Sequence, residues 1–76
     1  MRKRNGLGVK NMKNFGIRLK KLRESRGLSV EQLAQELNCP IYCLILWEKD
    51  RQTLSLGSLI KLAQYFNVSI DYLIGL

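Results

Sequence analysis

Two cysteines, Cys39 and Cys43, are the side chains of this 76-residue chain that come closest to a reactive or metal-binding pair. A structural zinc site needs about four ligands, and the chain has no histidine that could help to complete one. Cysteines four residues apart on one short helix also fit the geometry of a disulfide poorly. We therefore expect ordinary reduced cysteines in or near a core, with no metal and no cofactor.

No other group of residues has the types and spacing that catalysis requires. The chain lacks histidine, a nucleophile beside a base, and a glycine-rich loop that could bind phosphate. Its length predicts one small domain, with little room for a concealed active site. We expect a protein that is not an enzyme and has no small-molecule substrate.

Positive charge is concentrated at the N-terminal end of the chain. The net charge is +7, and residues 1–26 contain ten basic side chains against the single acid Glu24. Residues 27–76 contain three basic and five acidic side chains. This distribution indicates a polyanionic partner, for which nucleic acid is the usual candidate. A solvated tail followed by a solvated helix face would give the same count.

Membrane insertion and export are not indicated. The sequence has no run of about 18 apolar residues, the length at which a membrane-spanning helix is suspected. Its N-terminus is basic but lacks the apolar core of a signal peptide. We expect a cytoplasmic protein that does not contact a membrane.

Apolar spacing predicts an all-α fold of five short helices around one core, without any strand pattern. Residues 1–12 are expected to form a flexible basic arm and residues 13–76 the domain. Met12 could serve as an alternative translation start, in which case the arm would lie outside the working protein. Helices are expected at about 14–26, 29–37, 40–48 and 56–66 and from Ser69 onward, with a polar connection at 49–54. The residues expected to face inward are Phe15, Leu19, Leu22, Leu28, Leu33, Ala34, Leu37, Leu44, Trp47, Leu59, Ile60, Ala63, Phe66, Ile70, Leu73 and Ile74.

The second and third predicted helices form a helix-turn-helix. Ser29 and Gln32 have the spacing of a capping box, which would begin the second helix. Asn38 tolerates the left-handed backbone that the turn needs, and Pro40 suits the first turn of the next helix. Two helices of about two turns joined in this way most often set a helix in a DNA groove.

From Phe15 to Gly75, the chain resembles the phage-repressor and Cro-type helix-turn-helix domains of bacterial transcription regulators. The matching pieces are FGIRLKKLRESRGLS, EQLAQEL, WE at 47–48, SLGSLIKLAQYFNVS and DYLIG. The resemblance implies a five-helix, lambda-repressor-like bundle in which helices 2 and 3 form the helix-turn-helix. It also implies a small transcriptional regulator of repressor type that binds double-stranded operator DNA, commonly as a dimer.

The resemblance assigns roles to individual residues. Arg23 and Glu48 match a pair that braces the first helix against the third and holds the arginine near a backbone phosphate. A salt bridge with a purely structural role is an equal alternative for this pair. Ser29 matches a helix start that binds phosphate. Arg51, with Lys49 beside it, matches a basic phosphate contact in the loop after the third helix.

The base-reading positions of the family depart most from the expected chemistry. They correspond here to Val30, Ile41, Tyr42, Ile45 and Leu46. Direct readout uses hydrogen-bond donors and acceptors aimed at base edges, and only Tyr42 has such a group. The other four side chains can do no more than contact a thymine methyl group.

Three explanations of this apolar face are compatible with the sequence. The domain could bind DNA with weak base readout, using Arg51, Lys49, the first helix and the arm on phosphates. It could instead keep the fold and use the face to bind protein, including a second copy of itself. In the third explanation, the helix is rotated or shifted so that more of the face is buried. The apolar third helix favours the second explanation, whereas the basic arm and Arg51 favour the first.

The loop after the third helix also departs from the family. Members often have Asn-Gly after the WE pair and proline before the fourth helix. Lys49-Asp50 and Leu54 take these places here, which predicts a loop of different shape.

Overall fold

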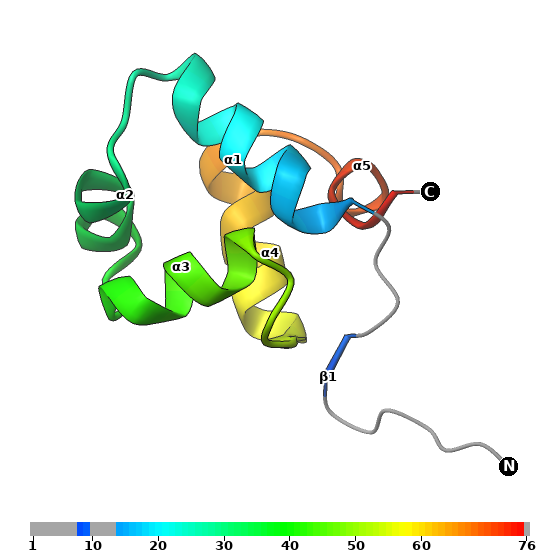
Figure 1. Ribbon diagram of the computed structural model, residues 1–76. Helices are drawn as coiled ribbons and strands as arrows, with labels where there is room; N and C mark the ends of the chain where they lie inside the picture. Colours follow the sequence, from blue (N-terminus) through cyan, green and yellow to red (C-terminus); the bar gives the residue numbers. More distant parts are fainter. Residues whose placement is uncertain (1–7, 10–13, 76) are drawn as a thin grey trace, which may run out of the picture.

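Five helices form the domain in a computed structural model that describes residues 8–9 and 14–75 (Figure 1). They are α1 (Phe15–Ser25), α2 (Val30–Leu37), α3 (Ile41–Glu48), α4 (Leu56–Phe66) and α5 (Ile70–Ile74). The prediction of an all-α fold with five short helices is confirmed. Within the described residues, no helix combines the length and the apolar character that a membrane span requires.

Serine side chains begin three of these helices, and the start of α2 at Ser29 is the one that the capping box predicted. The Ser29 hydroxyl accepts a hydrogen bond from the Gln32 backbone N–H at 3.0 Å, and the Gln32 side chain accepts one from the Ser29 N–H at 2.8 Å. Ser55 and Ser69 each accept a hydrogen bond from the N–H three residues further on. Pro40 stands just before α3, so this helix begins one residue later than predicted. Local capping chemistry therefore sets most of the helix starts.

Residues with a left-handed backbone end the helices. Gly27 has φ 68°, Asn38 has φ 56° and Asn67 has φ 57°. Glycine and asparagine are the residues that most often end a helix with this backbone conformation. Asp50 also has φ 56°. Asp50 stands where members of the family that the sequence resembles often have glycine, a residue that adopts this backbone without strain.

Every helix contributes to a single core. In Figure 1, α2 and α5 lie on opposite sides of α1 and α4, with α3 below α1. The apolar side chains that are buried in this core are Phe15, Leu19, Leu33, Ala34, Leu37, Leu44, Trp47, Leu54, Leu59, Leu62, Ala63, Phe66 and Leu73. The partly buried residues that pack against it include four that the sequence placed inward: Leu22, Leu28, Ile70 and Ile74.

One inward prediction in α4 is wrong. Ile60 is 38% exposed, whereas Leu62 is buried. The buried stripe of α4 runs through Leu59, Leu62 and Phe66, which are spaced i, i+3 and i+7. Ile60 lies at the edge of this stripe, because a helix that is apolar on most sides does not reveal its inner face by pattern alone.

The connection after α3 is less polar than predicted, and it takes part in a short strand pair. Leu54 is 1% exposed. Strand β2 (Leu54–Ser55) pairs antiparallel with β1 (Gly8–Val9), with Gly8 opposite Ser55 and Val9 opposite Leu54. Strands of two residues are too short to leave an alternating pattern in a sequence. The rest of the predicted arm lies outside the described residues.

Candidate nucleic-acid interface

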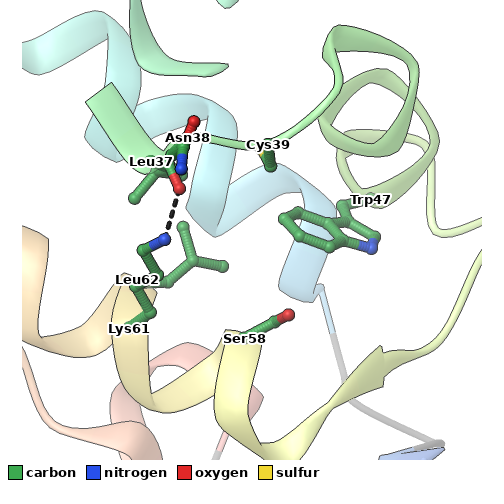
Figure 2. A pocket seen from close by; sticks show the side chains of 7 residues that line it. All are labelled: Leu37, Asn38, Cys39, Trp47, Ser58, Lys61 and Leu62. Carbon is green, nitrogen blue, oxygen red and sulfur yellow. Dashed lines mark hydrogen bonds between the residues drawn. The ribbon is translucent and has the colours of Figure 1, made fainter. Parts of the chain in front are cut away.

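The turn between α2 and α3 is fixed by backbone bonds and by a lysine from α4. The N–H groups of Asn38 and Cys39 donate to the carbonyl oxygens of Gln35 and Ala34, at 3.1 and 3.0 Å. The Lys61 ammonium donates to the carbonyl oxygen of Leu37 at the end of α2 (Figure 2). A cation at this end also complements the partial negative charge of the helix dipole. The helix-turn-helix is therefore held against α4.

A cleft of about 180 Å³ lies between this turn and α4. Figure 2 shows Lys61, Leu62 and Ser58 on the α4 side of the cleft, with Cys39 and Trp47 across from them. Both cysteines of the chain are free and half-buried. Burial raises the pKa of the Cys39 thiol, the proximity of Cys43 raises it further and Lys61 lowers it. Within residues 8–9 and 14–75, no group of three His, Cys, Asp or Glu side chains could hold a metal.

Arg23 of α1 joins Glu48 at the end of α3 in a two-pronged ion pair. Its Nε donates to Glu48 Oε2 at 2.7 Å and its Nη2 to Oε1 at 3.2 Å. Its Nη1 donates to the carbonyl oxygen of Leu28 at 2.8 Å. The Arg23 and Glu48 side chains are only 11% and 9% exposed. The hydrogen bonds with Glu48 raise the pKa of Arg23, although burial acts in the opposite direction. The expected salt bridge is thus present and braces α1 against α3.

Asp50 forms a second tie between the end of α3 and α1, which no sequence pattern predicted. Its Oδ1 accepts a hydrogen bond from the Gly16 N–H at 3.0 Å, in the first turn of α1. Asn14, which precedes α1, makes no capping bond with its side chain. A carboxylate at this place satisfies a helix N–H and favours the positive end of the helix dipole. A partner 34 residues away in the sequence leaves no local pattern that could reveal it.

The five predicted base-reading residues do not share one environment. Ile41, Tyr42 and Ile45 of α3 are 38%, 61% and 37% exposed. Val30 and Leu46 are half-buried. The outward face of α3 therefore consists of Ile41, Tyr42 and Ile45. The explanation in which the helix is turned to bury this face is wrong for these three residues.

A groove of about 250 Å³ brings part of this face together with lysines. It is lined by Val30 and Ile45 and by Lys20, Lys49, Arg23 and Glu48. Because Glu48 is paired with Arg23, the groove carries the uncompensated charge of Lys20 and Lys49 within the described residues. Sequence patterns give Lys20 no role beyond being one of the ten basic residues in residues 1–26.

Arg51 lies in the loop that follows α3. Its backbone N–H donates to the Leu46 carbonyl oxygen at 2.9 Å, and its side chain is exposed. Ser29, at the start of α2, is also exposed. The predicted phosphate-binding residues Ser29, Lys49 and Arg51 are therefore all accessible to a partner.

Known proteins that are similar to this chain include transcriptional regulators with a helix-turn-helix. A curated relative, the HTH-type transcriptional regulator ImmR of Bacillus subtilis (strain 168), is 36% identical over 62 residues. The match covers 82% of this chain and 49% of the relative, so the chain spans about half the length of the curated relative.

Solved structures of regulatory proteins are also similar to this chain. A transcriptional regulator from Listeria innocua superposes with a TM-score of 0.75 at 32% identity, covering 82% of this chain and 58% of that one. The restriction-modification controller protein C.AhdI from Aeromonas hydrophila superposes with a TM-score of 0.72 at 32% identity. That match covers 79% of this chain and 91% of C.AhdI. The family described as helix-turn-helix domain matches residues 16–76. With the motif, its braces and these likenesses in agreement, the chain belongs to the helix-turn-helix domain family.

Proposed function

We propose that this chain binds double-stranded DNA as a small transcriptional regulator of repressor type, with contacts to the phosphate backbone supplying most of the affinity. The observation that carries this proposal is the groove in which Val30 and Ile45 lie beside Lys20 and Lys49. Cations beside the exposed face of a second helix are what a helix-turn-helix needs on DNA. The relatives named as transcriptional regulators support the same function.

The residues divide into those that contact phosphate and one that positions them. Lys20, Lys49 and Arg51 supply charge around α3. The Ser29 hydroxyl already accepts a hydrogen bond from the Gln32 N–H. The N–H groups at the start of α2 that have no partner within the helix can therefore donate to a phosphate. Arg23 is a positioning residue, because Nε, Nη1 and Nη2 already donate to protein oxygens.

The proposal extends to a homodimer on DNA. Helix-turn-helix proteins commonly bind two half-sites about one helical turn apart as dimers. Sedimentation of the chain with and without duplex DNA checks this part separately. A two-to-one complex of protein with DNA is expected, and a strict one-to-one complex would contradict it.

The test is binding to a fluorescently labelled synthetic duplex, measured by anisotropy at increasing salt. The logarithm of the association constant should fall linearly with the logarithm of salt concentration, by about 0.9 for each phosphate neutralised. Lys49→Ala and Arg51→Ala should each reduce this slope by about one.

Lys21→Ala is the matched control, since Lys21 is exposed on α1 but does not line the groove. It should leave the slope nearly unchanged. Absence of binding at low salt would refute the proposal. An equal loss for all three lysine and arginine variants would show that total charge, and not the position of Lys49 and Arg51 at and after the end of α3, determines binding.

A further inference from the structure

The outward face of α3 has almost no hydrogen-bonding capacity. Ile41 and Ile45 are apolar, and Tyr42 contributes one hydroxyl group. The single charged residue of α3 is Glu48, and both of its carboxylate oxygens accept hydrogen bonds from Arg23. This face therefore cannot form the paired hydrogen bonds by which arginine reads guanine or glutamine reads adenine.

One apolar group is displayed on base edges in the major groove of DNA, the C5-methyl group of thymine. We propose that Ile41, Tyr42 and Ile45 recognise thymine methyl groups, so that the chain prefers duplexes rich in thymine. This inference rests on the proposed function, because it requires α3 to enter the major groove. It adds the base feature that is read and the residues that read it.

The spacing of the two isoleucines suits neighbouring base pairs. Residues four apart on a helix are separated by roughly 6 Å along its axis. Base pairs are stacked about 3.4 Å apart. Ile41 and Ile45 can therefore contact methyl groups within about two base-pair steps, and the exposed Tyr42 lies beside them.

The positive charge beside this face favours DNA over a second copy of the chain as its partner. Lys20 and Lys49 line the groove together with Ile45, and the chain carries a net charge of +7. Two copies joined through this face would bring like charges together, which opposes association. A duplex places negative phosphates on both sides of its major groove, where these lysines can meet them.

The experiment compares two synthetic duplexes with alternating A and T, one with thymidine and one with deoxyuridine in its place. Uracil pairs with adenine in the same way but lacks the methyl group. We expect the full chain to bind the uracil duplex roughly fourfold more weakly for each methyl group that the face would otherwise bury, and about tenfold or more weakly for two. The converse probe is an alternating G and C duplex, in which replacing cytosine by 5-methylcytosine should strengthen binding.

Protein variants show whether the methyl group is read directly. Ile41→Ala and Ile45→Ala should weaken binding to the thymine duplex more than binding to the uracil duplex, so that the affinity ratio between the two duplexes falls toward one. Ile60→Ala is the matched control, because Ile60 is as exposed as Ile45 but lies on α4. It should preserve the difference between the duplexes. Circular dichroism confirms that each variant is folded.

Each outcome decides the inference. Equal affinity for the two duplexes, with salt-dependent binding intact, would overturn methyl recognition and leave the proposed function standing. An Ile45→Ala variant that binds both duplexes as well as the unmodified chain would also overturn it. So would a variant that is weakened equally on both, since that result indicates a general structural role. Failure of the unmodified chain to bind either duplex at low salt would overturn both proposals.

Discussion

At the scale of single residues, Arg23 connects the elements that form the proposed interface. It reaches from α1 to both carboxylate oxygens of Glu48 and to the Leu28 carbonyl oxygen just before α2. Three parts of the chain are thus held by one guanidinium group. Its planar arrangement of donors suits this role better than the single ammonium of lysine would.

Removing one partner of this pair should destabilise the fold strongly. We expect Arg23→Ala to lower the free energy of unfolding by about 3 kcal/mol, because it leaves the largely buried carboxylate of Glu48 unpaired. Arg23→Lys keeps the charge but loses the two-pronged geometry, so its loss should be smaller. Urea unfolding followed by circular dichroism measures both. A loss below about 1 kcal/mol for Arg23→Ala would show that the pair behaves as an ordinary surface salt bridge.

Cys39 should be a slow nucleophile at neutral pH. Its raised pKa reduces the fraction of thiolate, the form that reacts, below that of an ordinary cysteine. Alkylation by iodoacetamide, followed by mass spectrometry, should therefore be slow at Cys39 and accelerate as pH rises. Cys39→Ala separates the contribution of Cys43. Reaction at Cys39 as fast as that of a small free thiol would contradict this expectation.

At the scale of elements, α1 is attached to the end of α3 at two places. Arg23 makes one attachment, and the Asp50 carboxylate on the Gly16 N–H makes the other. Gly16 lies so close to α3 that a Cβ there would stand 2.3 Å from the Glu48 carbonyl oxygen. The orientation of α3, which presents the outward face, therefore depends on its contacts with α1.

Gly16→Ala should destabilise the protein even though alanine favours helices by about 1 kcal/mol over glycine. The added methyl group collides with backbone, which has little freedom to move, and we expect a net loss of about 2 kcal/mol. Gly57→Ala is the matched control, since its nearest contact would be Ser55 Oγ at 3.9 Å. That variant should be neutral or slightly stabilised in thermal unfolding. Equal effects at the two glycines would argue against the close approach of α1 and α3.

Residues near each helix end predicted where most helices start and stop. Contacts between residues far apart in the sequence could not be predicted in this way. Ser29 and Asn38 act on groups within a few residues of themselves, so their roles can be read from the sequence. Asp50 and Gly16 are 34 residues apart, and Ile60 stands in a helix with apolar residues on most sides. The Arg23–Glu48 pair could be anticipated only through resemblance to a family.

At the scale of the whole molecule, charge and apolar surface are divided in a way that suits backbone-dominated DNA binding. Lys20 and Lys49 line the groove that Ile45 also lines, and the exposed face of α3 formed by Ile41, Tyr42 and Ile45 is apolar apart from one hydroxyl group. The sequence left three explanations of that face. The exposure of Ile41, Tyr42 and Ile45 excludes burial for these three residues, and the regulator relatives favour DNA over a protein-binding role.

An NMR titration of the labelled chain with a short synthetic duplex tests DNA binding through α2 and α3 most directly. Backbone amide signals at residues 29–31, 41–46 and 49–51 should shift, because these segments form the proposed interface. Signals at residues 57–60, at the start of α4, should remain nearly constant. Shifts confined to α4 and α5, or no shift at low salt, would contradict DNA binding through the helix-turn-helix.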